Sequence, residues 1–233
     1  MTNPTTAELL KYANLQMAAE AFIRNETTGQ LESSGQDLIN ALVAGNRHAS
    51  KFTLSEAQKF TFEWQVLDQK ANTATGFSGT LFKYLGPTDA SRGLTTGELV
   101  MSFRSTEFID DAARDNMATN TLELKNTGWA WGQIADMQAW YQSLNSDPLM
   151  LQGKSFSLTG YSLGGHLATA FNLLNPTAAA QTVTFNGAGV GKVNQGDLGT
   201  ALAEFNALRA DPSAVIPYLA DTAANQAKFV CAA

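Results

Sequence analysis

The sequence is poor in several residue types that many enzymes use for catalysis and binding. Its 233 residues include one cysteine, two histidines and no cluster of lysine and arginine. Cys231 has no second cysteine with which to form a disulfide, and we expect it to be inert. A net charge of −6 without a basic patch excludes attraction to a phosphate backbone, so nucleic acid is not an expected partner. His, Cys and Asp nowhere take metal-ligand spacing, and "GAGVG" at 187–191 lacks the GxGxxG order. We therefore expect no metal and no cofactor.

Long apolar runs are also missing. No stretch of about 18 apolar residues occurs, and residues 1–24 lack a basic region followed by an apolar run. We expect a soluble chain without an N-terminal signal peptide or transmembrane segment, and the composition assigns no location. A hydrophobic content of 44% suits one large core, so residues 1–233 are predicted to form one domain.

Apolar periodicity predicts helices first and then strands. The expected helices cover 5–24, 36–45, 53–64 and 128–144, with two more within 196–225. The expected strands cover 64–71, 76–86, 97–104, 155–160 and 181–187, and "AKFV" begins another. Thr53 and Glu56 have the spacing of a capping box, and 97–104 is apolar enough to be central. This alternation predicts an α/β fold with a mostly parallel sheet and helices on both faces.

The segment "FSLTGYSLGGHLATAFNLL" at 156–174 carries the main chemical signal. An apolar strand, a glycine-flanked serine and a small-residue helix follow one another, as GxSxG requires for a nucleophile on a sharp turn. Gly160 and Gly164 let strand and helix approach, Ser162 is the candidate nucleophile, and the N–H of Leu163 would stabilise an oxyanion. The alternative is a glycine-rich joint in which Ser162 only caps the helix.

Three segments together resemble the class 3 lipases: "FRST" at 103–106, "GYSLGGHLA" at 160–168 and "VTFNGAGVG" at 183–191. The similarity covers about residues 5–191 and is closer still to lipase-like domains of large secreted bacterial proteins with calcium-binding repeats, although no such repeats occur here. The resemblance implies an α/β-hydrolase that cleaves lipid-like esters through an acyl-enzyme, and it suggests a secreted bacterial protein.

The resemblance also assigns roles to the segment after the central strand. By position, Thr106 would contribute an oxyanion-hole N–H and hydroxyl, although a hydroxyl that caps the following loop is the alternative. Ser105 stands where many members have glycine. Arg104 would be a structural ion-pairing residue. Residues 107–127 are expected to form a loop with a short helix.

The sequence departs from the family in its acid and base. The family order is Ser, then Asp, then His, and "AKFVCAA" resembles the start of the acid-bearing strand, so we expect the C-terminal part of the domain to be missing. Within the sequence, Asp211, Asp221 and His166 are weak candidates for acid or base. His166 lies one helical turn below Ser162 rather than opposite it. His48 is expected to be exposed to water.

Three interpretations remain open: a serine hydrolase on lipid or small-molecule esters, an inactive binding module on the same scaffold, and a fragment that takes Asp and His from another polypeptide. An exposed sheet edge would favour a homodimer in the last case. The aromatic-rich segment 129–141 suits transient contact with a lipid surface, whereas helical spacing favours core packing for Trp140.

Overall fold

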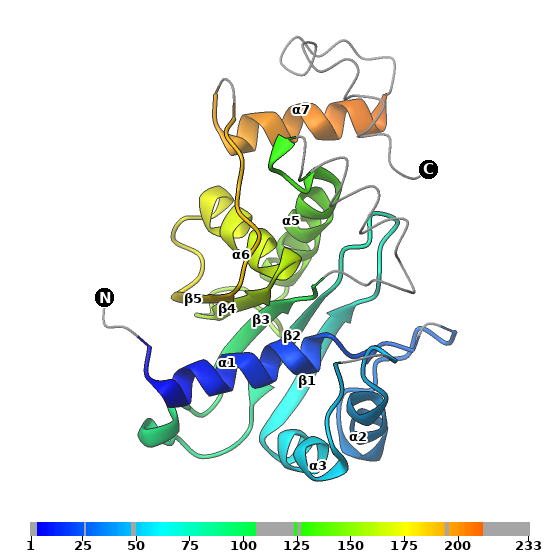
Figure 1. The fold of residues 1–233 in the computed structure, drawn as a ribbon, viewed down its shortest axis with the longest axis vertical. Coiled ribbons are helices and arrows are strands. Elements are labelled where there is room, and N and C mark those ends of the chain that lie inside the picture. Colours follow the sequence, from blue (N-terminus) through cyan, green and yellow to red (C-terminus); the bar gives the residue numbers. More distant parts are fainter. Residues whose placement is uncertain are drawn as a thin grey trace.

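Five strands form one mixed sheet in the computed structural model, which describes residues 4–25, 27–47, 50–105, 124, 127–193 and 196–211 (Figure 1). The strands are β1 (Trp64–Lys70), β2 (Gly79–Tyr84), β3 (Leu99–Phe103), β4 (Ser157–Tyr161) and β5 (Gln181–Phe185). They lie in chain order across the sheet, so β3 occupies the centre. The prediction of a central strand at 97–104 is confirmed.

Within the described residues the sheet is mixed and not mostly parallel as predicted. β1 pairs with β2 and β2 with β3 in antiparallel fashion, whereas β3–β4 and β4–β5 are parallel. Only the parallel pairs have a crossover helix between their strands, and parallel pairing requires such a crossover. The segments 71–78 and 85–98 contain no α-helix, and this absence was readable in the sequence.

Helices cover both faces of the sheet, as the sequence predicts. They are α1 (Thr6–Ala19), α2 (Gly35–Ala44), α3 (Leu54–Glu63), the 3-10 turn η1 (Ala90–Arg92), α5 (Trp131–Asn145), α6 (Leu163–Leu174) and α7 (Leu198–Ala210). The capping box predicted for Thr53 and Glu56 starts α3, and Thr5 with Glu8 makes the same arrangement at α1. In each box the threonine hydroxyl accepts the backbone N–H of the glutamate, and the glutamate carboxylate accepts the backbone N–H of the threonine. Two backbone donors at the start of the helix are thereby satisfied.

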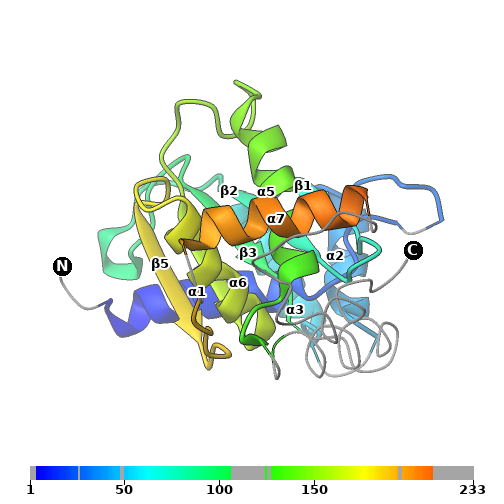
Figure 2. The same ribbon diagram turned by 90° about the horizontal axis from the view of Figure 1, so that it is seen from above.

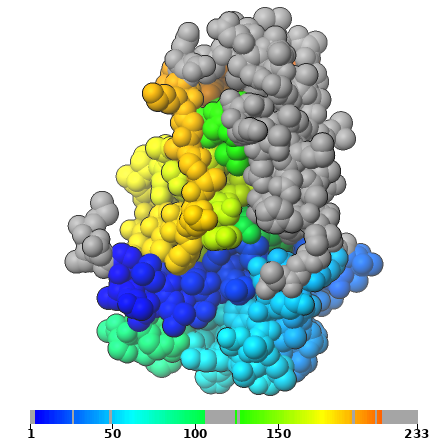
Figure 3. Space-filling view, viewed as in Figure 1, coloured from blue at the N-terminus to red at the C-terminus, as the bar shows by residue number. Residues whose placement is uncertain are grey.

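Two hydrophobic cores lie on opposite faces of the sheet. Neighbouring strand residues alternate between them, so that Leu81 belongs to the core under α5 and α6 while Phe82 belongs to the core under α1 to α3. Figure 1 shows these two layers, and in Figure 2 α7 lies across the side formed by α5 and α6. Figure 3 shows the blue and cyan N-terminal helices at one end of the surface and the yellow and orange segments above them. Trp140 is 4% exposed, so the core role expected for it is confirmed.

Helix α1 ends at Ala19, earlier than the predicted limit of 24. Beyond this point, Ile23 and Arg24 make tertiary hydrogen bonds in place of helical ones. The side-chain oxygen of Gln69 on β1 accepts the N–H groups of Ile23 and Arg24 at 2.8 and 2.7 Å. Gln69 is 1% exposed, so these bonds form in a buried setting where unpaired N–H groups would be costly.

Some predicted elements lie outside the described residues: the loop at 107–127 almost entirely, the strand at "AKFV" and the second helical stretch before it. In the described ranges, no helix is both long and apolar enough to cross a bilayer.

Candidate functional site

Ser162 lies at the sharp turn between β4 and α6 in a strained backbone conformation. Its φ of 51° and ψ of −115° place it in the left-handed half of conformational space, which residues with a Cβ rarely adopt. Although Ser162 occupies the N-cap position of α6, its side chain makes no capping hydrogen bond. The alternative interpretation of a simple capping serine therefore has no support in the geometry.

Three glycines allow this turn to pack closely. A Cβ on Gly160 would collide with the carbonyl of Gly164, and a Cβ on Gly164 would collide with the carbonyl of Phe103. A Cβ on Gly165 would come within 2.6 Å of the Cα of Gly187. These atoms belong to backbone that cannot rotate away, so the GxSxGG pattern is required by the approach of β4, β3 and α6.

The backbone around Ser162 is anchored to the chain that leaves β5. The N–H of Ser162 donates to the carbonyl of Phe185 at 3.0 Å, and the N–H of Ala188 donates to the carbonyl of Ser162 at 3.0 Å. Because β3, β4 and β5 are parallel, their carboxyl ends meet at the same edge of the sheet. Ser162 therefore lies where open α/β sheets commonly bind ligands.

Leu163 is the first residue of α6 and is 1% exposed. The first N–H groups of a helix have no partner within the helix and lie at its positive end, so this position suits a developing negative charge. Thr106, the other predicted oxyanion donor, lies outside the described residues. The structure does describe Ser105, directly before it.

His166 is fully buried, and both nitrogens of its ring are engaged by backbone. Nδ1 donates to the carbonyl of Gly189 at 2.9 Å, and Nε2 accepts the N–H of Ala130 at 3.2 Å. Burial lowers the pKa of His166, and the bond to Gly189 opposes this effect only in part. The ring is thus a neutral crosslink between the segments before α5 and after β5, and it has no nitrogen left for Ser162.

Of the remaining acid and base candidates, the structure describes only Asp211. Asp211 is exposed at the C-terminal end of α7. Asp221 and His48 lie outside the described residues.

A buried carboxylate that the sequence analysis missed lies near the site. Glu20 is 4% exposed and accepts both the N–H and the hydroxyl of Ser105, at 3.0 and 2.9 Å. The signal that could have indicated it is its position on the apolar face of α1, one turn after Gln16. Burial raises the pKa of Glu20, and the hydrogen bonds from Ser105 and the charge of Arg104 act in the opposite direction.

Arg104 is 3% exposed, and its guanidinium binds neutral groups of the chain. It donates to the carbonyls of Ala19 and Ala21 at 3.3 and 2.9 Å and to Asn72 Oδ1 at 3.1 Å. It also lies over the ring of Phe22, 4.6 Å from the ring centroid. Arg104 thus joins the end of β3 to the segment that leaves α1.

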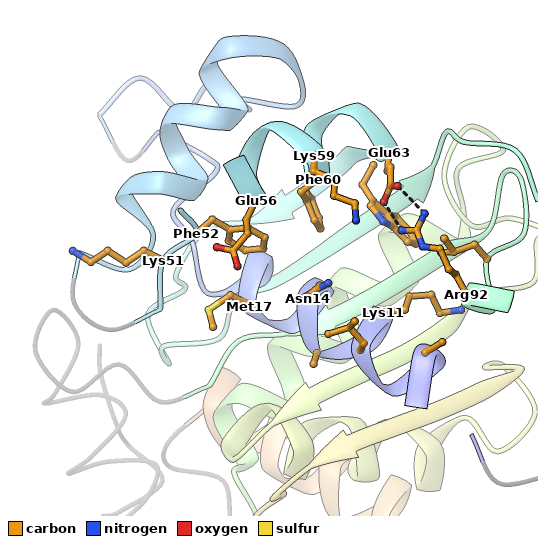
Figure 4. Close-up of a pocket in the computed structure, with 15 residues that line it drawn as sticks. Lys11, Asn14, Met17, Lys51, Phe52, Glu56, Lys59, Phe60, Glu63 and Arg92 are labelled. Atoms are coloured by element: carbon orange, nitrogen blue, oxygen red, sulfur yellow. Dashed lines mark hydrogen bonds and ion pairs between the residues drawn. The ribbon is translucent and has the colours of Figure 1, made fainter. Parts of the chain in front are cut away.

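A groove of about 490 Å³ lies between α1 and α3 (Figure 4). Phe52, Phe60 and Trp64 form much of its apolar wall. The guanidinium of Arg92 in this groove binds both oxygens of Glu63, at 2.8 and 2.7 Å. Ser162 does not line the groove, which belongs to the helical layer on the opposite face of the sheet from α6.

Comparison with protein-family models found no match, and comparison with curated proteins found no significant one. The structure by itself establishes an α/β fold with a five-strand mixed sheet and helices packed on it. Across the part of the chain that it describes, no group of three or more His, Cys, Asp or Glu residues could hold a metal ion.

Proposed function

We propose that this protein is a serine hydrolase of carboxylic esters, with an α/β-hydrolase fold related to the class 3 lipases. The observation that carries the proposal is the strained conformation of Ser162 at a strand-to-helix turn, with a hydroxyl that does not cap the helix. Backbone strain of this kind costs of order 1–3 kcal/mol and persists where the surrounding structure enforces it. The tightly packed glycines at 160, 164 and 165 provide that enforcement.

In the proposed reaction, the Oγ of Ser162 bonds to the ester carbonyl carbon while a general base takes the hydroxyl proton. The carbonyl oxygen becomes an oxyanion, which the N–H groups of Leu163 and Thr106 stabilise. The alcohol leaves with a proton, and an acyl group remains on Ser162. Water then attacks the acyl carbon, releases the carboxylic acid and restores the serine hydroxyl.

His166 does not supply the general base of this mechanism, because both of its ring nitrogens are bound to backbone groups. The proton acceptor is then His48 or a histidine that this sequence does not contain. Loss of triad members still leaves a residual rate that arises from the oxyanion hole and substrate binding. Because that residual rate does not require the serine, turnover that is lost in Ser162→Ala would show that a base acts on Ser162.

The substrates proposed are lipid-like or small-molecule esters, by resemblance to the class 3 lipases. Brief contact with a lipid surface fits such substrates. The aromatic residues considered for that contact are largely internal, since Trp129, Trp131 and Trp140 are at most 5% exposed. A lipid-contacting surface would therefore have to use other side chains.

The deciding experiment is hydrolysis of p-nitrophenyl esters with short and long acyl chains by the purified chain and by Ser162→Ala. We expect turnover in the parent protein and its loss, by at least about a hundredfold, in the variant. Ser146→Ala, a change at the exposed end of α5, is the matched control and should leave the rate unchanged. Equal rates in the parent and Ser162→Ala would reject the proposal.

A fluorophosphonate probe and light scattering separate the two alternatives. A folded monomer whose Ser162 never reacts with the probe would favour an inactive binding module. A homodimer, or activity gained on adding a polypeptide that carries Asp and His, would favour completion in trans. Within the described residues β5 pairs only with β4, so its other edge is the expected place for such pairing.

A further inference from the structure

Buried polar groups join the last turn of α1 to the end of β3. Gln16 and Glu20, one turn apart on the helix, are 5% and 4% exposed. The amide nitrogen of Gln16 donates to Glu20 Oε1 at 2.7 Å, and its oxygen accepts the hydroxyl of Ser102 at 2.7 Å. A continuous hydrogen-bond network therefore runs from the interior of the central strand to the Glu20 carboxylate.

This carboxylate holds Ser105 at two points. The backbone N–H of Ser105 donates to Oε1 of Glu20 at 3.0 Å, and its hydroxyl donates to Oε2 at 2.9 Å. β3 ends at Phe103, so Ser105 lies beyond the hydrogen-bond ladder of the sheet. Two bonds to one carboxylate fix both the backbone and the side-chain rotamer of this residue.

The chain at this point touches the turn that carries Ser162. A Cβ on Gly164 would lie 3.0 Å from the carbonyl oxygen of Arg104 and would collide with that of Phe103. The first turn of α6 therefore rests on the two residues that precede Ser105. Any movement of the chain at Ser105 would change what lies beside the candidate nucleophile.

Simple packing does not account for a carboxylate in this position. Burial raises the pKa of Glu20 because it removes the charged group from water, while Arg104 and the hydrogen bonds oppose the shift. An apolar side chain of similar volume would fill the same space without that desolvation penalty. What an apolar side chain would not supply is the pair of acceptors that Ser105 uses.

We propose that Glu20 is a positioning residue of the hydrolase site, which fixes the chain leaving β3 at Ser105 so that it forms one wall of the oxyanion site beside Ser162. This inference rests on the proposed function. Both donors of Ser105 are consumed by Glu20, so Ser105 is not itself an oxyanion donor.

The test compares kcat and KM for p-nitrophenyl acetate in the parent protein, Glu20→Leu and Glu20→Gln, with thermal unfolding measured alongside. Glu20→Leu should lower kcat about tenfold or more and change KM less than about twofold, because the oxyanion wall acts mainly in the transition state. Glu20→Gln should retain at least about a third of kcat, since its carbonyl oxygen can accept the N–H and its amide can donate to the hydroxyl. The control is Ser146→Ala, at the exposed end of α5 and outside this network, which should keep the parent kcat.

An unchanged kcat in folded Glu20→Leu would overturn the positioning role while leaving the hydrolase intact. A Glu20→Gln variant as impaired as Glu20→Leu would also overturn it, because the charge and not the geometry would then matter. If the parent protein and Ser162→Ala react equally, the proposed function fails and this inference fails with it. Should Glu20→Leu not fold, Ser105→Ala decides: a decrease of about threefold supports the role, and no decrease overturns it.

Discussion

At the scale of single residues, the most informative side chain is His166, because its position in the sequence and its role in the structure differ. Four residues after a candidate nucleophile, it invites assignment as a base. In the fold its ring is fully buried and connects Gly189 to Ala130, and the indole of Trp129 lies 5.8 Å away, measured between ring centroids. A general base must first lie within hydrogen-bond reach of the proton that it takes, and only then does its pKa matter. The histidine is best understood as a crosslink that supports the walls around the turn.

The stability of the protein should fall on acidification through His166. Its pKa is lowered by burial, so the unfolded chain takes up a proton below about pH 6.5 while the folded ring does not. The stabilising contribution is therefore complete above that pH and is lost as the pH falls. Between pH 7.5 and 5.5 we expect the free energy of unfolding to drop by about 1 kcal/mol more in the parent protein than in His166→Gln. Urea unfolding at both pH values measures this, and equal drops in the two proteins would contradict it.

Glu20 predicts the opposite pH dependence. Burial raises its pKa in the fold, and the charge of Arg104 beside it opposes this shift only in part. The folded state therefore holds the proton of Glu20 more tightly than the unfolded chain does. The associated stability is complete below about pH 4.3 and is lost as the pH rises through the folded pKa. Glu20→Gln should therefore gain stability relative to the parent, by about 1 kcal/mol or more, as the pH rises from about 4 towards 7. A constant difference across that range in urea unfolding would argue against a raised pKa.

At the scale of elements, the turn from β4 to α6 depends strictly on glycine. Gly160 and Gly164 face each other across the turn, and Gly164 also faces the end of β3. The strain at Ser162 is maintained because strand, helix and neighbouring strand are packed too closely to relax. The conformation of one serine is thus a property of three elements.

Gly164→Ala should destabilise the protein by at least about 2 kcal/mol, because the added Cβ overlaps backbone atoms that cannot move aside. Gly189→Ala is the matched control, since a Cβ there would meet nothing within 4 Å. Thermal unfolding of the two variants should show a clear loss for position 164 and a shift close to zero for position 189. Similar unfolding temperatures would mean that the two elements separate more easily than their packing indicates.

At the scale of the whole molecule, one sheet connects two cores. Trp64 belongs to the core on the α1 side, whereas Trp129, Trp131 and Trp140 belong to the core on the α5 side. The five strands that the structure describes form one sheet between the two cores, so each core has this sheet as one of its walls. We therefore expect both faces to unfold together.

Leu15→Ala in a Trp64→Phe background tests this coupling. Leu15 is fully buried on the α1 side, and its truncation should cost about 2–5 kcal/mol. The remaining tryptophans report only on the opposite face, and their fluorescence transition in urea should shift by the full amount. Leu10→Ala, at a residue that is 61% exposed, should shift it by less than about 0.5 kcal/mol. A transition on the α5 side that ignores Leu15→Ala would show two independent units.

By itself, the sequence determined the elements and the strand-turn-helix around Ser162, because these follow from local periodicity, capping boxes such as Thr53 with Glu56, and the steric demands of glycine. Tertiary structure alone decided what depends on contacts between distant segments. The early end of α1 at Ala19 and the role of His166 as a crosslink both arise from partners far away in the chain. The hydrogen bonds from Ser105 to Glu20 are the clearest case, since these two residues are 85 positions apart and meet only when α1 packs on the end of β3. No local pattern carries that information, because burial and hydrogen-bond partners are set by packing.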